Sequence, residues 1–404
     1  MKEKPDVLIT LLGSNPIVPV TSIKYYVRST TKIYILLSKD MQFILNRIKS
    51  WKQKYFNNLK GLVWEEIIVD PYNPTIIRER LTNQIKTKDL EGNIVLDVTG
   101  GTKQMTLAVF MYLQNFNING NKIWLSYIVN QPWKMIVSDI DSLQTYHYPV
   151  AEKFSLKEVI HLHQDKVNFG KLPKATLLIN LSHVICQNIV QDRGNKTWNN
   201  WKNKNIHDCF NGRNTKGERE LEKIHLDFSK FPDIVQQLSD DKKRATFEIN
   251  DLKGILSFNS NKKVVDWFNG FWLETYTFSL FKNTKLGSLV DDIKVNVHVF
   301  DPEFELDVVI LVKNRIYVIS ISTGFGKGNL GKADLKKKIF EVIIRSRQIG
   351  GWKAYYGLIS LTDRPEELEK EVEDYLVDRS VKVFGRRDLI DLEEKIINWI
   401  ELSI

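Results

Sequence analysis

Residues 94–103, which read Ile-Val-Leu-Asp-Val-Thr-Gly-Gly-Thr-Lys, constrain the fold of this chain more than any other segment. The first five residues form an apolar, β-branched run that predicts a buried strand, and Gly100 and Gly101 end it. Thr102 can cap a helix that we expect over residues 103–115. A strand, a tight glycine turn and a helix in this order indicate an α/β domain.

The side chains beside this turn suit an anionic ligand. Backbone N–H groups and the positive end of a helix dipole converge at such a turn. Thr99, Thr102 and Lys103 add two hydroxyls and one cation at the carboxyl end of a strand, where open α/β sheets bind ligands. The alternative is an ordinary structural turn. The flanking hydroxyl and ammonium groups favour a phosphate or nucleotide site.

Strands and helices alternate along the first 150 residues. Apolar runs predict strands at residues 7–12, 32–37, 62–70, 94–98, 123–129 and 135–140, with helices between the first five. This alternation predicts a mostly parallel, doubly wound sheet. A second polar turn, Gly13-Ser14-Asn15-Pro16, follows the first strand. Because parallel strands end at the same edge of a sheet, we expect this turn and the Gly100 turn to line one crevice.

Length and composition limit the class of protein. The chain has 404 residues, 43% hydrophobic and 26% charged, which suffices for two or three domains with cores of their own. No apolar run is long enough to span a membrane and no apolar signal region follows Met1, so we expect a cytoplasmic location. Cys186 and Cys209 are too few for a disulfide framework or a cysteine zinc site. The net charge of +9 favours a polyanionic partner.

The pattern is weaker in the middle of the chain, where residues 177–190 predict either a helix or a strand. Trp198 and Trp201 lie in a basic, Asn-rich stretch, and aromatic residues in such a setting can stack on bases. An exposed insertion or linker is the favoured interpretation of that stretch. His161 and His163 are expected on one face of a strand. No histidine has carboxylates or cysteines at ligand spacing, so we expect none to bind a metal.

The last 140 residues predict a helix, a strand, a hairpin, and then alternating helices and strands. Glu274 lies inside the apolar stretch of the first helix, where a carboxylate needs a partner or a metal. Asp307 lies inside the strand expected at residues 305–312. A Lys313-Asn314 turn joins this strand to the next one, at residues 315–321. Metal-dependent nucleases hold Mg²⁺ or Mn²⁺ with carboxylates arranged in this way.

Both ends of the chain resemble known families. Residues 12–16 and 97–103 resemble the turns of CRISPR-associated Rossmann-fold (CARF) domains. Residues 269–274, 305–309 and 319–324, with the glycine pair at 350–351, resemble the restriction-endonuclease-like, or PD-(D/E)xK, domain that often accompanies them. The resemblance implies an α/β protein with a Rossmann-like CARF domain at residues 1–152, a linker or insertion at 153–263, and an α/β restriction-endonuclease-like domain at 264–404.

Members of this family act downstream of type III CRISPR systems. The resemblance implies a homodimer that binds cyclic oligoadenylate, commonly cyclic tetra-adenylate, and thereby turns on a metal-dependent nuclease that degrades DNA, RNA or both. Mn²⁺ or Mg²⁺ would be its cofactor. The residues implied to line the ligand crevice are Gly13, Ser14, Asn15, Thr99, Gly100, Gly101, Thr102 and Lys103.

The nuclease motif departs from the family pattern at two positions. Ser320 and Ser322 stand where the family has an acidic residue and a lysine, so the implied catalytic set is Glu274, Asp307, Ser320 and Ser322, with the first two as metal ligands. A serine cannot neutralise a metal or stabilise an attacking hydroxide as a lysine does. A lysine from just beyond, Lys327 or Lys332, could replace the missing one.

Three functions therefore remain open from the sequence. The first is a cyclic-oligoadenylate-responsive protein with an active nuclease. The second is a sensor or sequestering protein whose nuclease fold has lost its chemistry. The third is a ring nuclease that cleaves the cyclic ligand in the CARF crevice, where Ser14 would align a ribose hydroxyl and Lys103 would stabilise charge on the phosphate.

Overall fold

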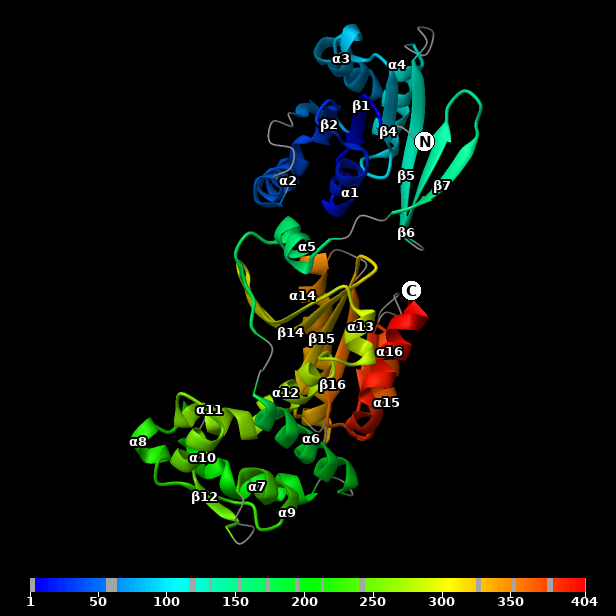
Figure 1. Ribbon diagram of the computed structural model, residues 1–404. Helices are drawn as coiled ribbons and strands as arrows, with labels where there is room; N and C mark the ends of the chain where they lie inside the picture. The colour runs from blue at the N-terminus through cyan, green and yellow to red at the C-terminus, as the bar shows by residue number, and fades with distance from the viewer. Residues whose placement is uncertain are drawn as a thin grey trace. The chain divides into compact units, whose positions relative to one another are not determined.

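Figure 1 shows the computed structural model, which describes residues 4–55, 64–115, 121–130, 133–150, 154–171, 175–192, 196–211, 214–239, 244–324, 328–350, 354–375 and 381–403. The chain divides into two compact units. The first comprises Met1–Val167 with Gln348–Gly351, and the second comprises Asn168–Arg347 with Trp352–Ser403. Residues 168–263, expected as part of a linker or insertion, thus belong to the same compact unit as most of the C-terminal region.

The first unit is built on a seven-stranded sheet with the order β3-β2-β1-β4-β5-β6-β7. Neighbours from β3 to β5 are parallel, and β6 and β7 are antiparallel additions. The strands are β1 (Val7–Leu11), β2 (Lys32–Ser38), β3 (Trp64–Val69), β4 (Asn93–Asp97), β5 (Lys122–Asn130), β6 (Trp133–Asp139) and β7 (Thr145–Pro149). The predicted mostly parallel α/β sheet is therefore confirmed, and β7 is an additional edge strand.

Helices cover both faces of this sheet (Figure 1). They are α1 (Ile17–Tyr26), α2 (Gln42–Tyr55), α3 (Pro74–Gln84) and α4 (Lys103–Gln114). The unit also contains α5 (Leu156–His163), which packs against α2, and the short 3-10 helices η1 (Lys39–Met41) and η3 (Thr87–Asp89). Alternate strand residues such as Ile9 and Leu96 form one core with apolar residues of α3 and α4. The residues between them, including Thr10 and Asp97, face the side of α1, and this alternation sets up the site described below.

The second unit contains a six-stranded mixed sheet with the order β17-β16-β15-β14-β13-β8. The strands are β8 (Val167–Asn168), β13 (Asp292–Phe300), β14 (Glu303–Val312), β15 (Arg315–Ser322), β16 (Tyr355–Ser360) and β17 (Val381–Phe384). Strands β13, β14 and β15 are antiparallel neighbours, whereas β15, β16 and β17 run parallel. Lys313 and Asn314 join β14 to β15 with positive φ angles of 48° and 61°, as the predicted hairpin turn requires.

The helices of this unit lie before, between and after its strands. They are α6 (Thr176–Gln191), α7 (Lys196–Asn205), α8 (Glu218–Leu221), α9 (Pro232–Leu238), α10 (Ile249–Ile255), α11 (Asn261–Asp266), α12 (Trp272–Ser279), α13 (Lys285–Leu289), α14 (Gly328–Gly350), α15 (Pro365–Glu373) and α16 (Leu392–Ser403). A π-helical turn, η6 (Trp267–Phe271), joins α11 to α12, and 3-10 helices occur at η5 (His207–Cys209) and η8 (Arg386–Asp391). Two short strand pairs, β9 (Phe210–Asn211) with β10 (Asn214–Thr215) and β11 (His225–Asp227) with β12 (Thr246–Glu248), lie among the helices.

The expectation of an exposed stretch around Trp198 and Trp201 is wrong. The two side chains are 2% and 5% exposed, and their rings stack on α7 with centroids 4.7 Å apart. Phe231 packs edge-on against both of them. The three-residue spacing of the tryptophans places them on one face of a helix, so they form a core and are not available to stack on bases.

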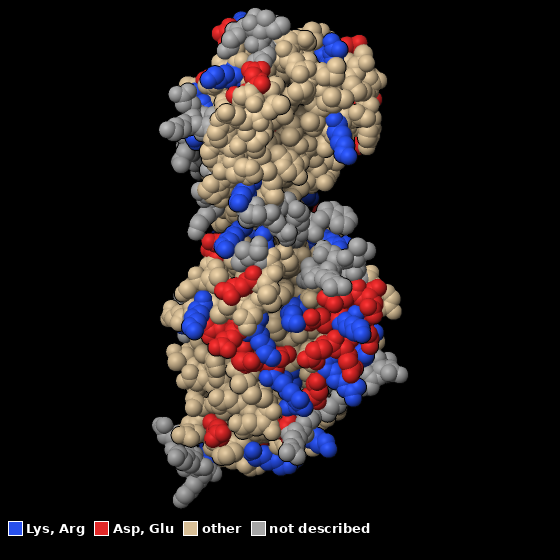
Figure 2. Space-filling model, turned by 90° about the vertical axis from the view of Figure 1, so that its right-hand side faces the viewer, with Lys and Arg blue, Asp and Glu red and all other residues tan. Residues whose placement is uncertain are grey.

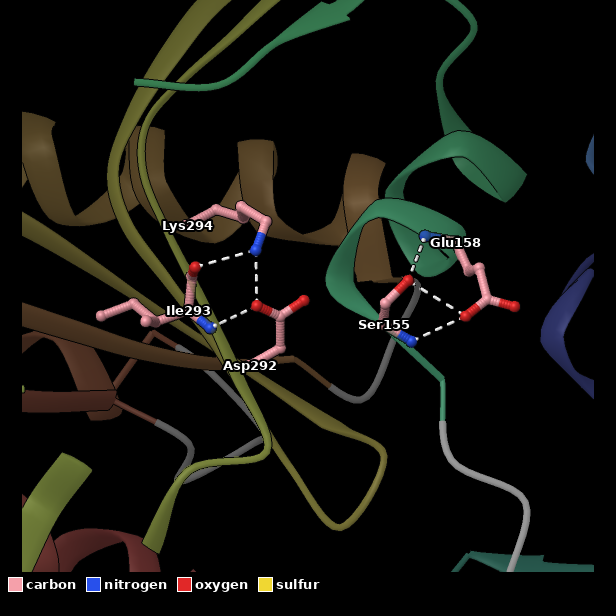
Figure 3. Close-up of polar contacts among 5 residues, drawn as sticks. All are labelled: Ser155, Glu158, Asp292, Ile293 and Lys294. Carbon is pink, nitrogen blue, oxygen red and sulfur yellow. Dashed lines mark hydrogen bonds and ion pairs between the residues drawn. The ribbon is translucent and has the colours of Figure 1, made fainter. Parts of the chain in front are cut away.

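The histidine pair is also placed differently from the prediction. His161 and His163 lie on helix α5, not on a strand, and residues two apart do not share a helix face. Ser155 and Glu158 begin this helix with a reciprocal capping box, which Figure 3 shows: the Ser155 hydroxyl accepts from the Glu158 N–H, and the Glu158 carboxylate accepts from the Ser155 N–H. The capping box therefore favours a helix here, although the alternating residues around His161 and His163 suggested a strand.

Several charged side chains on the second unit form pairs of opposite sign. Figure 2 shows acidic and basic residues closely mixed on one face of the molecule. Lys382 pairs with Glu369 at 3.0 Å, and Lys395 pairs with Asp388. At the start of β13, Lys294 bonds to Asp292, as Figure 3 also shows. The positive net charge is therefore not gathered into one basic field on the face in Figure 2.

In the parts of the chain that the structure describes, no helix has the length and apolarity needed to cross a bilayer.

Candidate functional site

Two glycine-containing turns meet at the carboxyl edge of the first sheet. Strands β1 and β4 are parallel neighbours, with Thr10 opposite Asp97. A Cβ atom on Gly13 would lie 3.3 Å from the Gly101 nitrogen, and one on Gly100 would lie 2.1 Å from the carbonyl oxygen of Leu11. Gly101 has a φ of +72°, which glycine adopts without strain. The expectation that the two turns come together is confirmed, and glycine is what allows this approach.

A buried carboxylate ties these turns to the neighbouring elements. Asp97 Oδ2 accepts hydrogen bonds from Thr10 Oγ1 at 3.0 Å and from Ser22 Oγ at 2.6 Å. Its Oδ1 accepts from the N–H of Thr99 at 3.1 Å and from the Thr99 hydroxyl at 2.6 Å. Burial raises the pKa of Asp97, and these hydrogen bonds oppose the rise. The sequence analysis did not assign this role, although an Asp inside an apolar strand is a signal for it.

The two threonines of the turn use their hydroxyls within the fold. Thr99 Oγ1 also accepts from the N–H of Ile128 at 2.9 Å. Thr102 Oγ1 accepts from the N–H of Met105 at 3.2 Å and donates to the carbonyl oxygen of Pro71 at 2.5 Å, so it caps α4 as predicted. Both hydroxyls therefore stabilise the turn itself, a role that the sequence analysis assigned only to Thr102.

Other groups of the turns face solvent. Ser14 and Lys103 are exposed, and Lys103 is the first residue of α4. Asn15 Oδ1 accepts from the N–H of Ile17 at 3.1 Å and so stabilises the start of α1. Among the residues that the structure describes, the Lys103 ammonium forms no ion pair or hydrogen bond. A cation at a helix N-terminus beside glycine N–H groups is an arrangement that can hold phosphate oxygens.

The predicted nuclease residues lie in the second unit, on neighbouring strands and on α12. Asp307 is on β14, and its Oδ2 accepts from the Ser320 hydroxyl at 3.2 Å and from the N–H of Ile321 at 2.6 Å, both on β15. Ser322 Oγ accepts from the N–H of Gly324 at 3.2 Å. Burial raises the pKa of Asp307, and the Ile321 N–H opposes the rise.

Glu274, on α12, is half-buried and interacts electrostatically with the carboxylates of β14. Burial is the main cause that raises the pKa of Glu274 to about 8, and the charges of Asp307 and Glu305 add to it. Glu274 is therefore mostly protonated at neutral pH. The structure thus brings three of the four implied catalytic residues, Glu274, Asp307 and Ser320, into one neighbourhood.

A pocket of about 240 Å³ lies over Asp307. Strands β14 and β15 and helix α14 contribute its lining, which consists of Glu305, Leu306, Asp307, Ser320, Lys338, Glu341, Val342 and Arg345. Lys338 is the lysine of this pocket, and the sequence analysis missed it. Of the two lysines considered there, Lys332 pairs with Glu371, and Lys327 lies outside the described residues. A lysine on a basic helix carries no local signal that marks it as part of a pocket.

The donor set for a metal ion is small. Within the described ranges, no group of three or more His, Cys, Asp and Glu side chains is arranged to hold a metal. Glu274 and Asp307 offer two carboxylates. Mg²⁺ is commonly held by one or two carboxylates together with water and substrate phosphates, so these residues fit a weakly held ion of that kind.

Comparisons with known proteins agree with this architecture. Residues 7–159 match the family model of the Card1 CARF domain. The chain is similar in structure to Can2 from Sulfobacillus thermosulfidooxidans, determined in complex with cyclic tetra-adenylate, with a TM-score of 0.67, 17% identity, and coverage of 98% of this chain and 97% of that chain. A crystal structure of protein VC1899 from Vibrio cholerae gives a TM-score of 0.66 at 16% identity, with 98% of each chain covered. A search of curated proteins gives no match.

At these identities, the similarity to the solved structures establishes the fold and not the activity. The match to the family model includes both glycine turns and Lys103. Residues 7–159 are thus similar to the Card1 CARF domain, and over nearly its whole length the chain has the fold of Can2 and VC1899.

Proposed function

We propose that this protein is a sensor of cyclic oligoadenylate, in particular cyclic tetra-adenylate, in type III CRISPR defence. The observation that carries the proposal is the contact between the Gly13 turn and the Gly100-Gly101 turn beside the exposed Lys103, in a segment that matches the Card1 CARF domain. Backbone N–H groups and one ammonium suit the phosphates of the ring. Can2, which shares the fold, was determined with cyclic tetra-adenylate bound.

The proposed receptor is a homodimer that holds one ring between two copies of the crevice. A ring with two-fold symmetry suits an isologous dimer, because each subunit then offers the same turn. Exposed apolar side chains on the same unit support this assembly. Leu107 and Met111 are 50% and 44% exposed and lie one turn apart on α4, and Tyr72 and Ile76 are exposed at the start of α3, which packs against α4.

The proposed output is metal-dependent cleavage of DNA or RNA by the second unit, acting as a restriction-endonuclease-like domain. Glu274 and Asp307 would hold Mg²⁺ or Mn²⁺, and Ser320 would orient Asp307 through its hydrogen bond. A bound metal would supply a Lewis acid for the phosphate and lower the pKa of a water. Glu274 must lose its proton to bind the ion. Two carboxylates bind weakly, so the activity should need millimolar Mn²⁺ and turn over slowly.

Incubation of the protein with cyclic tetra-adenylate, Mn²⁺, plasmid DNA and RNA tests the proposal when both the ring and the nucleic acid are followed. Cleavage that depends on the ring, and that Asp307→Ala abolishes, would support it. Equal cleavage by wild type and Asp307→Ala would mean that the chemistry lies elsewhere. Linear products from the ring alone would indicate a ring nuclease.

A second function, a binding protein without nuclease activity, is favoured by the two serines on β15. Ser320 does not provide the negative charge that the family pattern has at its position, and Ser322 does not provide the positive charge. If the scaffold is otherwise intact, the double change Ser320→Glu with Ser322→Lys should raise Mn²⁺ affinity and cleavage. A ring that binds tightly but leads to no cleavage, in wild type or in the double variant, would instead identify a sensor or sequestering protein.

A further inference from the structure

We propose that Lys338 is the residue that anchors a nucleic-acid phosphate in the pocket over Asp307, an inference that rests on the proposed nuclease function. Lys338 lines this pocket together with Asp307 and Ser320, which lie on the two central strands. Its side chain is exposed, so a phosphodiester can reach it from solvent. The lysine comes from helix α14 and not from strand β15, where the family pattern would place one.

The charges around the pocket make such an anchor necessary. Glu305, Asp307 and Glu341 line it, and Glu274 interacts with it from α12. A phosphodiester is itself negative, so it approaches these carboxyl groups only if a cation offsets the repulsion. The positive lining residues are Lys338 and Arg345.

The two cations are not equivalent. The Arg345 guanidinium lies over the ring of Phe304, 4.8 Å from its centroid, on the neighbouring strand. The Lys338 ammonium forms no ion pair with any residue that the structure describes. Its charge nevertheless reaches the carboxylates, because it lowers the pKa of Asp307 and of Glu274 against the effect of their burial. Lys338 is therefore the cation that is available to a ligand.

Helix geometry separates Lys338 from its neighbours. Lys338, Val342 and Arg345 follow the spacing of one helix face, and all three line the pocket. Lys332 and Lys336 are both paired with Glu371. Lys337 is also exposed but lines a neighbouring hollow on α14, with Phe340 and Ile344, that shares Glu341 and Arg345 with the pocket over Asp307. Lys337 thus provides a matched control for the loss of one positive charge from the same helix.

The first test measures binding of fluorescein-labelled single-stranded and duplex oligonucleotides to the full-length protein with cyclic tetra-adenylate, in EDTA so that nothing is cleaved. Lys338→Ala should weaken binding of the better ligand roughly tenfold, because a charge-assisted contact is lost. Lys338→Arg should retain most of the affinity, and Lys337→Ala should change it less than twofold. Equal losses in Lys338→Ala and Lys337→Ala would overturn the assignment.

The second test uses Mn²⁺ alone, measured by titration calorimetry with the same variants. Removing an ammonium beside two carboxylates should tighten Mn²⁺ binding severalfold in Lys338→Ala and leave it unchanged in Lys337→Ala. A purely structural role of Lys338 would not produce tighter metal binding.

Ser322→Lys in the Lys338→Ala background should restore oligonucleotide binding, because it returns a lysine to the adjacent strand.

These readouts separate the inference from the proposed function. A wild type that cleaves neither DNA nor RNA, with the two Lys338→Ala effects present, would overturn the nuclease and leave Lys338 as the phosphate anchor. Unchanged oligonucleotide and Mn²⁺ binding in a folded Lys338→Ala variant would overturn the anchor, whatever the cleavage assay shows.

Discussion

The Ser22 hydroxyl on α1 donates a 2.6 Å hydrogen bond to the buried carboxylate of Asp97, 75 residues further along the chain. The same carboxylate holds Thr10 on β1 and Thr99 in the β4–α4 turn. One side chain thus joins the first strand, the first helix and the turn proposed to bind the ring. The arrangement of these three elements depends on a carboxylate that is itself fully buried.

Replacing Asp97 should therefore loosen the turn and the fold together. Asp97→Ala leaves buried hydroxyls and an N–H without their acceptor, so we expect a loss of about 2–4 kcal/mol in the free energy of unfolding. Ring binding should weaken as well. Urea denaturation and a ligand titration check both effects. Glu91→Ala, at an exposed position in the loop before β4, is the control and should alter neither; a stable Asp97→Ala with normal binding would contradict this account.

Gly100 should tolerate no side chain. A Cβ there would lie 2.1 Å from the carbonyl oxygen of Leu11, so Gly100→Ala must displace one turn from the other. We expect a loss of ring binding of at least tenfold and a lower melting temperature. Gly254→Ala is the matched control: a Cβ at Gly254 meets nothing within 4 Å, and alanine favours helix α10. Equal ring affinity in the two variants would show that the close contact of the turns is not needed.

Local patterns were sufficient to predict most of the first unit. The strand expected at residues 32–37 is Lys32–Ser38, and the helix expected at residues 103–115 is Lys103–Gln114, because β-branched runs, glycine turns and caps act within a few residues. Strand β7, whose residues are mostly exposed, was not predicted. The buried pair at Trp198 and Trp201 was misread, because the Asn and Lys residues around it gave the helix a polar composition.

The two candidate sites also contain some features that local sequence patterns predict and others that they do not. The alternation of elements predicts parallel strands, and parallel strands place the two glycine turns at the same edge of the sheet. That β1 and β4 are direct neighbours, so that the turns touch, was not predicted. The hydrogen bonds of Asp97 and the position of Lys338 depend on which helix packs on which strands, and that information is not local. Lys336, Lys337 and Lys338 are alike in the sequence, and only the orientation of α14 directs the last of them to the pocket over Asp307.

Lys103 should contribute directly to ring affinity. Its exposed ammonium at the start of α4 is proposed to bind a ring phosphate, and one charge-assisted contact contributes roughly 1.5–3 kcal/mol. Lys103→Ala should therefore weaken cyclic tetra-adenylate binding tenfold or more in a calorimetric titration. Lys122→Ala removes an equally exposed lysine at the opposite end of the strands, where β5 begins, and should have little effect. Unchanged affinity in Lys103→Ala would mean that the ligand does not bind at this turn.

The proposed dimer should depend on the apolar surface of α4. Leu107 is 50% exposed, and a lysine there would place a charge in the middle of the proposed contact. Light scattering should show a dimer for wild type without ligand and a monomer for Leu107→Lys, with one ring bound per dimer. Leu402→Lys, at a position 90% exposed on α16, should remain dimeric. A monomeric wild type, or one ring per chain, would contradict the assembly.

Glu274 should make both stability and metal binding depend on pH. Its pKa in the folded protein is about 8, above its usual value near 4.5, because burial and the charges of Asp307 and Glu305 disfavour the ionised form. Between these two values the native state holds a proton that the unfolded state has released. The stability that this group provides is therefore complete below pH 4.5 and is lost as the pH rises through 8.

We expect the free energy of unfolding of the wild type to fall by on the order of 2 kcal/mol between pH 5 and pH 8 from this group, given its partial exposure. Glu274→Gln should remove that slope, whereas Glu401→Gln, at an exposed position, should keep it. Mn²⁺ must displace the same proton, so its affinity for the wild type should rise up to tenfold per pH unit until about pH 8. Parallel pH profiles for wild type and Glu274→Gln, in urea denaturation and in Mn²⁺ titration, would show that Glu274 is ionised like a surface carboxylate. Equal Mn²⁺ affinities in the two proteins would show that Glu274 takes no part in the proposed metal site.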